Sequence, residues 1–328
     1  MKSIKNKRIL LSPLNWGLGH VTRTIPIIQQ LLNQENEIFI CCNSTQKSFY
    51  KPFFPFINYL HHEGYPFTFK GRGNWTIDLI KSYSPLKHFL NTEREKVKTW
   101  VKQFSPDLII SDQRFGFYHT AVKSVLITHQ LNLPVPKWNF FAHVLNNNLI
   151  NQFDEIWVPD EVGNLLSGKL SETRRKNVFY LGYCSRFKLL PDISYAKTKK
   201  TFKYAAIISG PEPYAGLFLE LIMNKLKKIR SPFVIIVGKG VVNKINPPKN
   251  CTIFIQPDHD ELTTILLSTE IIISRSGYST LMDLSAINKK AILIPTKGQG
   301  EQLYLAKFHS EHPNWKFVNE KTFQQMVL

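Results

Sequence analysis

Short apolar runs alternate with segments of helical periodicity along most of this chain, and no other feature restricts its fold as strongly. The runs that we interpret as strands lie at residues 8–12, 37–41, 108–111, 124–128, 155–158, 204–208, 233–237, 252–255, 271–273 and 291–294. The segments with helical spacing lie at 22–32, near 93–104, at 215–229, at 260–267 and after 280. Strands that alternate with helices form parallel sheets covered on both faces. The sequence therefore predicts an α/β protein.

The alternation lapses once, and this break divides the chain into two domains. Residues 188–203 are rich in Lys, Thr and Pro, and we interpret them as a linker. The expected fold is two Rossmann-like, doubly wound domains that face a cleft, one at 1–187 and one at 204–328. The last helix is a candidate to pack back on the N-terminal domain. Two such domains in tandem take a ligand between them, at the carboxyl ends of their strands.

The net charge of +18 indicates either an anionic partner or a general basic bias in residue usage. Nucleic acid, an anionic membrane and phosphorylated substrates all match such a charge. The Lys and Arg residues are spread along the chain without a nucleic-acid motif, so nucleic acid is the weakest of these partners. A bias toward Lys, Asn and Ile explains the charge equally well.

Several features favour a cytoplasmic location, with a peripheral position at the inner face of the membrane as an extension of it. No apolar run approaches the roughly 20 residues of a membrane span. The N-terminus does not resemble a signal peptide, and the four cysteines are scattered. The apolar stretch 52–57 suits shallow docking on an anionic membrane, with packing beneath helices as the alternative. The basic residues near this stretch are Lys47, Lys51, Lys70, Arg72, Lys81 and Lys87.

The first strand is followed by a glycine turn that brings a histidine to the start of a helix. Gly17, Gly19 and His20 lie in this turn. A nicotinamide dinucleotide is disfavoured, because the third glycine is missing and residues 41–43 lack the acid that usually ends the second strand. A histidine at a sheet's carboxyl edge is well placed to abstract a proton. His20 is therefore a candidate base, with capping of the helix as the alternative.

Two more residues at strand ends of the N-terminal domain are candidates. Asp112 follows a strand and is expected to point into the cleft, where it orients His20, serves as the base itself, or is only a turn residue. His129 ends the next strand and either lines the acceptor pocket or is structural. The pair His61 and His62, like His259, lacks metal-ligand spacing and is interpreted as surface or loop. We therefore expect no metal site.

The C-terminal domain carries two polar turns after successive strands. Residues 274–283 place small hydroxylated residues and a glycine between a strand and a helix, which is an anion site or an ordinary capped turn. An acid one turn into that helix, Asp283, can accept hydrogen bonds from sugar hydroxyls. One unit later, residues 298–302 place polar side chains between glycines, and Glu301 and Gln302 suit a sugar with several hydroxyls.

The pairing of these two turns resembles the C-terminal donor site of GT-B glycosyltransferases. The similarity is greatest to the family 28 group, which includes the peptidoglycan N-acetylglucosaminyltransferases and the monogalactosyldiacylglycerol synthases. The turn that ends at His20 is similar to their glycine-rich N-terminal loop. The resemblance extends over most of the chain in order and spacing, and it is specific in these three places.

The resemblance implies a role for each donor-site residue. Asp283 matches the carboxylate that binds the ribose, where the family usually has Glu. Ser279 and Thr280, after Gly277, match the positions that bind diphosphate, and Arg275 is a candidate to add charge. Gln299 lies beside Glu301 and Gln302, which match contacts to the donor sugar. Leu303 stands where peptidoglycan members often carry a second Gln, which argues against that substrate. The loop 209–213 is a doubtful phosphate loop, since two prolines remove N–H donors.

The function implied is inverting, metal-independent transfer of a sugar from a nucleotide-sugar, expected to be a UDP-sugar, to an acceptor hydroxyl deprotonated by His20. The acceptor is unknown, with a lipid-linked or cell-envelope molecule as a candidate. No cofactor is expected, because the nucleotide-sugar is itself a substrate. One alternative is a GT-B-fold UDP-sugar epimerase. The other is a non-catalytic basic protein that binds polyanions.

Overall fold

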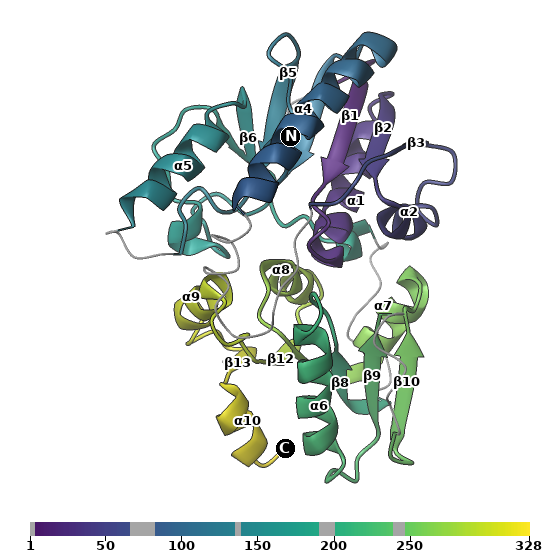
Figure 1. The fold of residues 1–328 in the computed structure, drawn as a ribbon. Helices are drawn as coiled ribbons and strands as arrows, with labels where there is room; N and C mark the ends of the chain where they lie inside the picture. Colours follow the sequence, from purple (N-terminus) through teal and green to yellow (C-terminus); the bar gives the residue numbers. More distant parts are fainter. Residues whose placement is uncertain (1–3, 66–82, 135–138, 190–200, 239–246) are drawn as a thin grey trace. The chain divides into compact units, whose positions relative to one another are not determined.

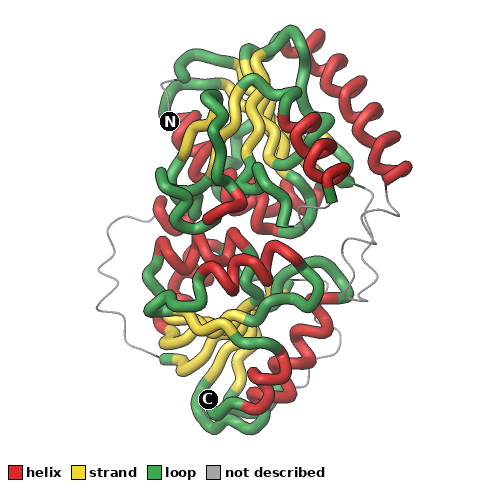
Figure 2. The backbone as a smooth tube through the Cα atoms, turned by 90° about the vertical axis from the view of Figure 1, so that its left-hand side faces the viewer, coloured by secondary structure: helices red, strands yellow, loops and turns green. Residues whose placement is uncertain are grey.

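The computed structural model describes residues 4–65, 83–134, 139–189, 201–238 and 247–328 (Figure 1). The chain separates into two compact units, and the boundary lies between Arg186 and Phe187. In each unit the strands form one layer and helices cover it (Figure 2). Most of the linker expected at 188–203 lies outside the described residues, but its last two residues already belong to a strand of the second unit.

The N-terminal unit is built on a seven-stranded parallel sheet in the order β3-β2-β1-β4-β5-β6-β7. Its strands are β1 (Arg8–Pro13), β2 (Glu37–Cys42), β3 (Asn58–His61), β4 (Leu108–Asp112), β5 (Lys123–Ile127), β6 (Glu155–Val158) and β7 (Val178–Tyr180). The order reverses between β1 and β4, which pair with Pro13 opposite Asp112. Ligands of open α/β sheets bind at such a reversal, beyond the carboxyl ends of the strands.

Among the described residues, the α-helices that accompany this sheet are α1 (Leu18–Leu32), α2 (Ser44–Tyr50), α4 (Tyr83–Phe104) and α5 (Phe140–Ile150). Helix α1 follows Gly17, whose φ of 110° strongly favours glycine. Helix α4 lies across one face of the sheet (Figure 1). Its Val97 and Trp100 pack on Leu10 of β1 and Ile109 of β4. These contacts bury the centre of the sheet beside the reversal.

The C-terminal unit repeats the plan with six parallel strands in the order β10-β9-β8-β11-β12-β13. Its strands are β8 (Phe202–Ile207), β9 (Phe233–Val237), β10 (Cys251–Ile255), β11 (Thr269–Ser274), β12 (Lys290–Leu293) and β13 (Trp315–Phe317). The reversal lies between β8 and β11. The predicted α/β architecture of two Rossmann-like sheets is therefore confirmed.

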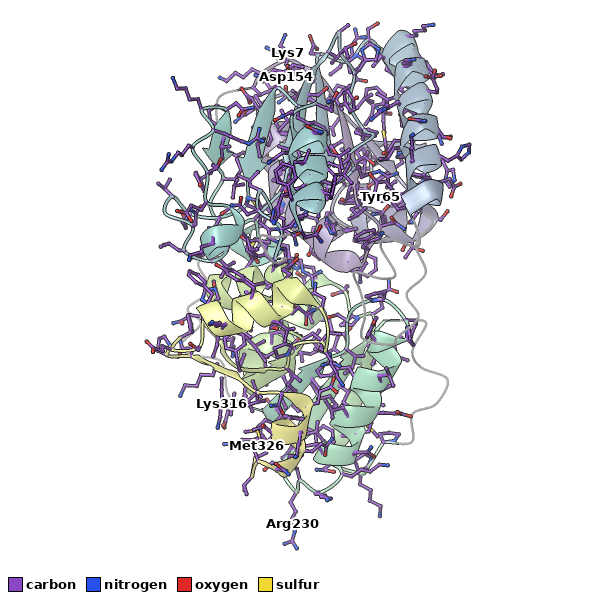
Figure 3. The ribbon with its side chains drawn as sticks, turned by 60° about the vertical axis from the view of Figure 1, so that its left-hand side comes forward. Lys7, Tyr65, Asp154, Arg230, Lys316 and Met326 are labelled. Atoms are coloured by element: carbon purple, nitrogen blue, oxygen red, sulfur yellow. The ribbon has the colours of Figure 1, made fainter. Side chains whose placement is uncertain are left out.

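The described part of the C-terminal unit contains the helices α6 (Tyr214–Leu226), α7 (His259–Ser268), α8 (Tyr278–Ala286), α9 (Gly300–Phe308) and α10 (Glu320–Gln325). Helix α10 is the last helix, which we named as a candidate to pack on the N-terminal domain. Its Phe323 is fully buried in the core of the C-terminal unit. The Lys225 ammonium of α6 donates to the carbonyls of Gln324 and Met326, and Met326 is labelled in Figure 3.

A buried ion network lies in the N-terminal unit at the base of the loop after β4. Arg114 donates to the Glu93 carboxylate of α4 at 2.6 Å, and the His62 ring lies 2.9 Å from the same oxygen. All three side chains are at most 2% exposed. His62 follows β3 in a loop, as one of its two interpretations had it, but it is buried and not at the surface, while its neighbour His61 is exposed. The network holds together β3, α4 and the β4–β5 loop.

Burial of His62 predicts a specific pH dependence of stability. Burial lowers the pKa of His62 from 6.5 to about 4, although the hydrogen bond to Glu93 opposes the shift. Between these pH values the unfolded chain binds the proton and the folded chain does not, so acidification favours unfolding. We expect His62 alone to remove up to about 3 kcal/mol of unfolding free energy as the pH falls from about 6.5 to about 4.

Urea unfolding at several pH values tests this expectation. His62→Gln keeps an amide donor for Glu93 but does not titrate, so it should reduce the slope of unfolding free energy against pH in this window. His61→Gln is the matched control, because that ring is exposed. An unchanged slope in His62→Gln would show that His62 does not carry the effect.

Candidate functional site

The reversal of the N-terminal sheet brings His20 and Asp112 together. His20 lies in the first turn of α1, just beyond β1, and Asp112 is the last residue of β4. The Nδ1 atom of His20 lies 3.0 Å from Oδ2 of Asp112. The Asp112 side chain is fully buried, whereas 17% of the His20 side chain is exposed. Of the roles considered for Asp112, the structure supports orientation of His20, because a fully buried carboxylate is shielded from an acceptor.

Arg23 is a member of this cluster that the sequence interpretation did not single out. Its Nε lies 3.0 and 3.1 Å from the two oxygens of Asp112, and its Nη2 also contacts Asp112. Its Nη1 lies 3.5 Å from Nδ1 of His129. The sequence does contain a signal for Arg23. This residue follows His20 by three residues, and residues three apart on a helix lie on the same face. His129 is thus buried within the cluster.

The charges of this cluster shift both titrating groups downward. Burial alone would raise the pKa of Asp112, but the charges of Arg23 and His20 hold that pKa below its usual value. Burial lowers the pKa of His20, and the charge of Arg23 lowers it further, while Asp112 opposes the shift. The cluster therefore favours an ionised Asp112 beside a neutral imidazole, which is the form that accepts a proton.

The loop that carries Gly17 and Gly19 is fixed by hydrogen bonds to the neighbouring loops. The Gln46 amide of α2 donates to the carbonyls of Pro13 and Leu14. The backbone N–H of Tyr65, which is labelled in Figure 3, donates to the Asn15 side chain at 2.8 Å. The start of α1 is therefore held on both sides before any ligand binds, which favours a defined orientation of His20.

In the C-terminal unit, the first turn of α8 differs from those of its neighbours. Helices α7, α9 and α10 each begin with a side chain that accepts a backbone N–H bond, from Asp258, Gln299 and Asn319. At α6, the Glu212 carboxylate of the loop 209–213 accepts a hydrogen bond from the backbone N–H of Gly216. The chain itself therefore places a negative charge at the start of this helix. Among the described residues, α8 has no such cap and no acid in its first turn. Its N-terminus therefore suits an external anion.

Gly277 precedes α8 and makes its backbone approachable. Its φ of −71° and ψ of 149° are ordinary extended values that any residue adopts. A Cβ built on Gly277 would meet no described atom closer than Thr280 Oγ1, at 4.0 Å. Neither backbone geometry nor crowding within the described residues thus requires glycine here, and the lack of a side chain leaves this stretch of backbone approachable. Ser279 and Thr280 lie in the first turn, and Asp283 follows in the second.

The turn between β12 and α9 is fixed by its own glutamines. Oε1 of Gln299 accepts from the backbone N–H of Gln302, and Oε1 of Gln302 accepts from that of Thr296 at 2.8 Å. Gln299 thus caps α9, and the amide of Gln302 is held with its NH₂ group still able to donate. Gly298 has a φ of 80°, which favours glycine. Glu301 lies beside Gln302 in the first turn of α9.

Arg275 has a different position from the one expected of a phosphate ligand. Its guanidinium is 2.8 Å from the Glu320 carboxylate of α10 and lies over the Phe218 ring of α6. It also donates to the carbonyls of residues 294 and 295 at 3.3 Å. Because its charge is paired and its side chain is nearly buried, we assign it to packing of α6 and α10 beside β12.

Comparison with known proteins gives matches in both sequence and fold. Residues 218–323 match the glycosyltransferase family 28 C-terminal domain. The chain is 21% identical over 266 residues to the UDP-N-acetylglucosamine–N-acetylmuramyl-(pentapeptide) pyrophosphoryl-undecaprenol N-acetylglucosamine transferase of Clostridium novyi (strain NT), over 76% of this chain and 72% of that one.

Solved structures share the whole two-sheet plan. The spinosyn rhamnosyltransferase SpnG bound to thymidine diphosphate matches 97% of this chain and 90% of its own, with 11% identity and a TM-score of 0.65. Arabidopsis thaliana UGT89C1 bound to quercetin matches 98% and 89%, with 10% identity and a TM-score of 0.67. MurG of Acinetobacter baumannii matches 98% and 87%, with 15% identity and a TM-score of 0.55.

The architecture and the polar strand ends define a glycosyltransferase of the GT-B fold. Within that class the chain is family 28-like, since residues 218–323 match the family's C-terminal domain. The resemblance to GT-B glycosyltransferases of the family 28 group is thereby confirmed. The roles of the individual residues stay predictions.

The position of Arg275 predicts that its replacement affects stability more than nucleotide binding. Arg275→Gln removes the ion pair with Glu320 and the contact with Phe218, and we expect a loss of about 2 kcal/mol in unfolding free energy. We expect the Kd for UDP, measured by calorimetry, to stay within about threefold of the wild-type value.

Lys316→Gln is the matched control for Arg275→Gln. It removes the same charge from an exposed position on β13, labelled in Figure 3, and should change neither stability nor binding. A tenfold weaker Kd in Arg275→Gln with unchanged stability would instead make Arg275 a phosphate ligand.

Proposed function

We propose that this glycosyltransferase moves a sugar from a UDP-sugar to an acceptor hydroxyl with inversion at the anomeric carbon and without a metal ion. The acceptor oxygen forms the new bond to the anomeric carbon, and the bond from that carbon to the diphosphate breaks. The nucleoside diphosphate leaves with the bonding electron pair. His20 takes the proton of the acceptor hydroxyl, so charge and atoms balance.

The observation that carries this proposal is the pairing of His20 with the buried Asp112. A neutral imidazole whose Nδ1 faces an ionised carboxylate has Nε2 as its basic nitrogen. A general base of this kind increases a reaction rate by activating a nucleophile. A protein that only binds a ligand has no need of such a base. The pair therefore supports catalysis rather than binding alone.

The C-terminal unit supplies the donor site in this proposal. The first turn of α8, with Gly277, Ser279 and Thr280, stabilises the charge that develops on the departing diphosphate. Asp283 accepts hydrogen bonds from the ribose hydroxyls, and Glu301 and Gln302 contact the sugar. The support is the uncapped start of α8 and the fixed amide of Gln302. Because a helix N-terminus provides the stabilisation, transfer should persist in EDTA.

A thermal-shift screen against UDP-, GDP- and TDP-sugars identifies the nucleotide, because a ligand that binds only the folded state raises its stability. With the donor found, Asp283→Ala should weaken nucleotide binding by about tenfold, the loss of one charge-assisted contact. His20→Ala should bind UDP like the wild type and lose transfer by at least about a hundredfold.

Three outcomes of these assays contradict parts of the proposal. Wild-type turnover in His20→Ala removes His20 from the mechanism, and unchanged nucleotide affinity in Asp283→Ala removes that ribose contact. Conversion of the sugar without any acceptor identifies an epimerase. Asp283→Asn is the conservative variant, since it keeps one acceptor oxygen while removing the charge.

We further propose that the acceptor is presented at an anionic membrane surface. The relative from Clostridium novyi acts, by its name, on an undecaprenol-linked substrate. In the N-terminal unit Phe56 is 98% exposed, and Lys51 beside it is exposed as well, although Phe54 of the same stretch is buried. Among the described residues no helix is long and apolar enough to cross a membrane.

Sedimentation with vesicles tests this surface. The wild type should bind vesicles that contain phosphatidylglycerol more strongly than neutral ones, and Phe56→Ser should weaken that binding by about tenfold, since a full aromatic side chain is removed from the lipid. Val162→Ser, also at an exposed residue of this unit, is the control. Equal binding to neutral vesicles, or no effect of Phe56→Ser, contradicts docking through this stretch.

A further inference from the structure

Arg23 contacts three members of the catalytic cluster at once. Its side chain is 2% exposed, and it lies on α1 one turn after His20. Its Nε spans both oxygens of Asp112, its Nη2 lies 2.9 Å from Nδ1 of His20, and its Nη1 approaches His129. A planar guanidinium directs these donors in fixed directions, which the single ammonium of a lysine does not.

These contacts determine which nitrogen of His20 carries the proton. An ionised carboxylate only accepts hydrogen bonds, so the approach of Asp112 to Nδ1 favours a proton on Nδ1. Nη2 of Arg23 carries two hydrogens and lies 2.9 Å from the same Nδ1, but it contacts Asp112 more closely, so we assign its hydrogen bond to the carboxylate. Nδ1 and Nη2 thus both donate to the same carboxylate, and Nε2 of His20 keeps its lone pair.

We propose that Arg23 is a positioning residue for the His20 base. Its guanidinium holds the Asp112 carboxylate in the one orientation in which it accepts the Nδ1 proton, and this selects Nε2 as the basic nitrogen. The proposal rests on the proposed function, because it concerns the same base. It assigns to Arg23 no contact with either substrate.

The charge of Arg23 has a second effect on the same base. The charged and titrating groups that face His20 are Arg23 on α1, Asp112 on β4 and His129 after β5. Burial and the charge of Arg23 lower the pKa of His20, and Asp112 raises it. The His20–Asp112 pair titrates as a unit, so loss of the Arg23 charge makes proton uptake by the pair easier and moves it to higher pH.

Two variants separate geometry from charge. Arg23→Lys keeps the positive charge but loses the planar fork, so we expect His20 to populate both neutral tautomers while its titration midpoint stays near the wild-type value. Arg23→Gln removes the charge, so we expect the midpoint to move up by about one pH unit, a tenfold change in proton affinity. Neither variant should change the Kd for UDP.

NMR of histidine labelled with ¹³C and ¹⁵N in the intact protein measures both quantities without an acceptor. His20→Gln assigns the His20 signals, and ring ¹⁵N shifts report which nitrogen is protonated. Near-UV circular dichroism establishes that each variant is folded. If Arg23 is purely structural, both folded variants keep the wild-type tautomer and titration midpoint of His20. This result would overturn the proposal.

The wild-type protein provides a test that does not depend on the folding of any Arg23 variant. Its neutral His20 should carry the proton on Nδ1, and a proton on Nε2 contradicts the proposal. This test also separates the two proposals. If His20→Ala retains transfer, His20 is not the base, yet the tautomer measurement still decides whether Arg23 orients the pair.

Discussion

The parallel pairing of β1 with β4 is the constraint on which the N-terminal site depends. Its register places Pro13 opposite Asp112, and the Leu14 N–H continues the ladder by donating to the Asp112 carbonyl at 3.0 Å. The loop after β1 therefore leaves the sheet beside the Asp112 carboxylate, and α1 starts with His20 within hydrogen-bond distance of it. A slip of one residue would point Asp112 to the other face of the sheet.

Two buried ion clusters lie on either side of Gln113, whose φ of 61° is left-handed. Asp112 is paired with Arg23, and Arg114 is paired with Glu93. Removal of one partner would leave the other as an uncompensated buried charge, which is costly, so each pair favours a single arrangement of its loop. Both pairs therefore fix the geometry of the loop that follows Asp112, and this effect on geometry, rather than added stability, is what they have in common.

The sequence predicted the strands near the sheet reversals well and the peripheral elements poorly. Central strands such as β1 and β9 are buried on both faces and form uninterrupted apolar runs, so their pattern is strong. The edge strands β3 and β13 are short, and their alternation is too brief to recognise. The early start of α4 at Tyr83 was missed, although Leu86, Phe89 and Leu90 already have helical spacing; Pro85 does not break the helix, because proline is tolerated in a first turn.

More of the candidate anion site at α8 than of the His20 cluster could be predicted from the sequence, and this difference has a physical origin. The anion site at α8 uses backbone N–H groups, so it needs only a glycine and small residues in consecutive positions, which a local motif records. The candidate base of the N-terminal unit depends on Asp112 and His129 at two strand ends and on His20 and Arg23 of helix α1, which the register brings together. The sequence leaves orientation of His20 by Asp112 as one of three roles for that residue, and the helical spacing of His20 and Arg23 does not connect either of them to Asp112. The folded sheet is needed to show that the three side chains meet, because Asp112 lies about 90 residues from the other two.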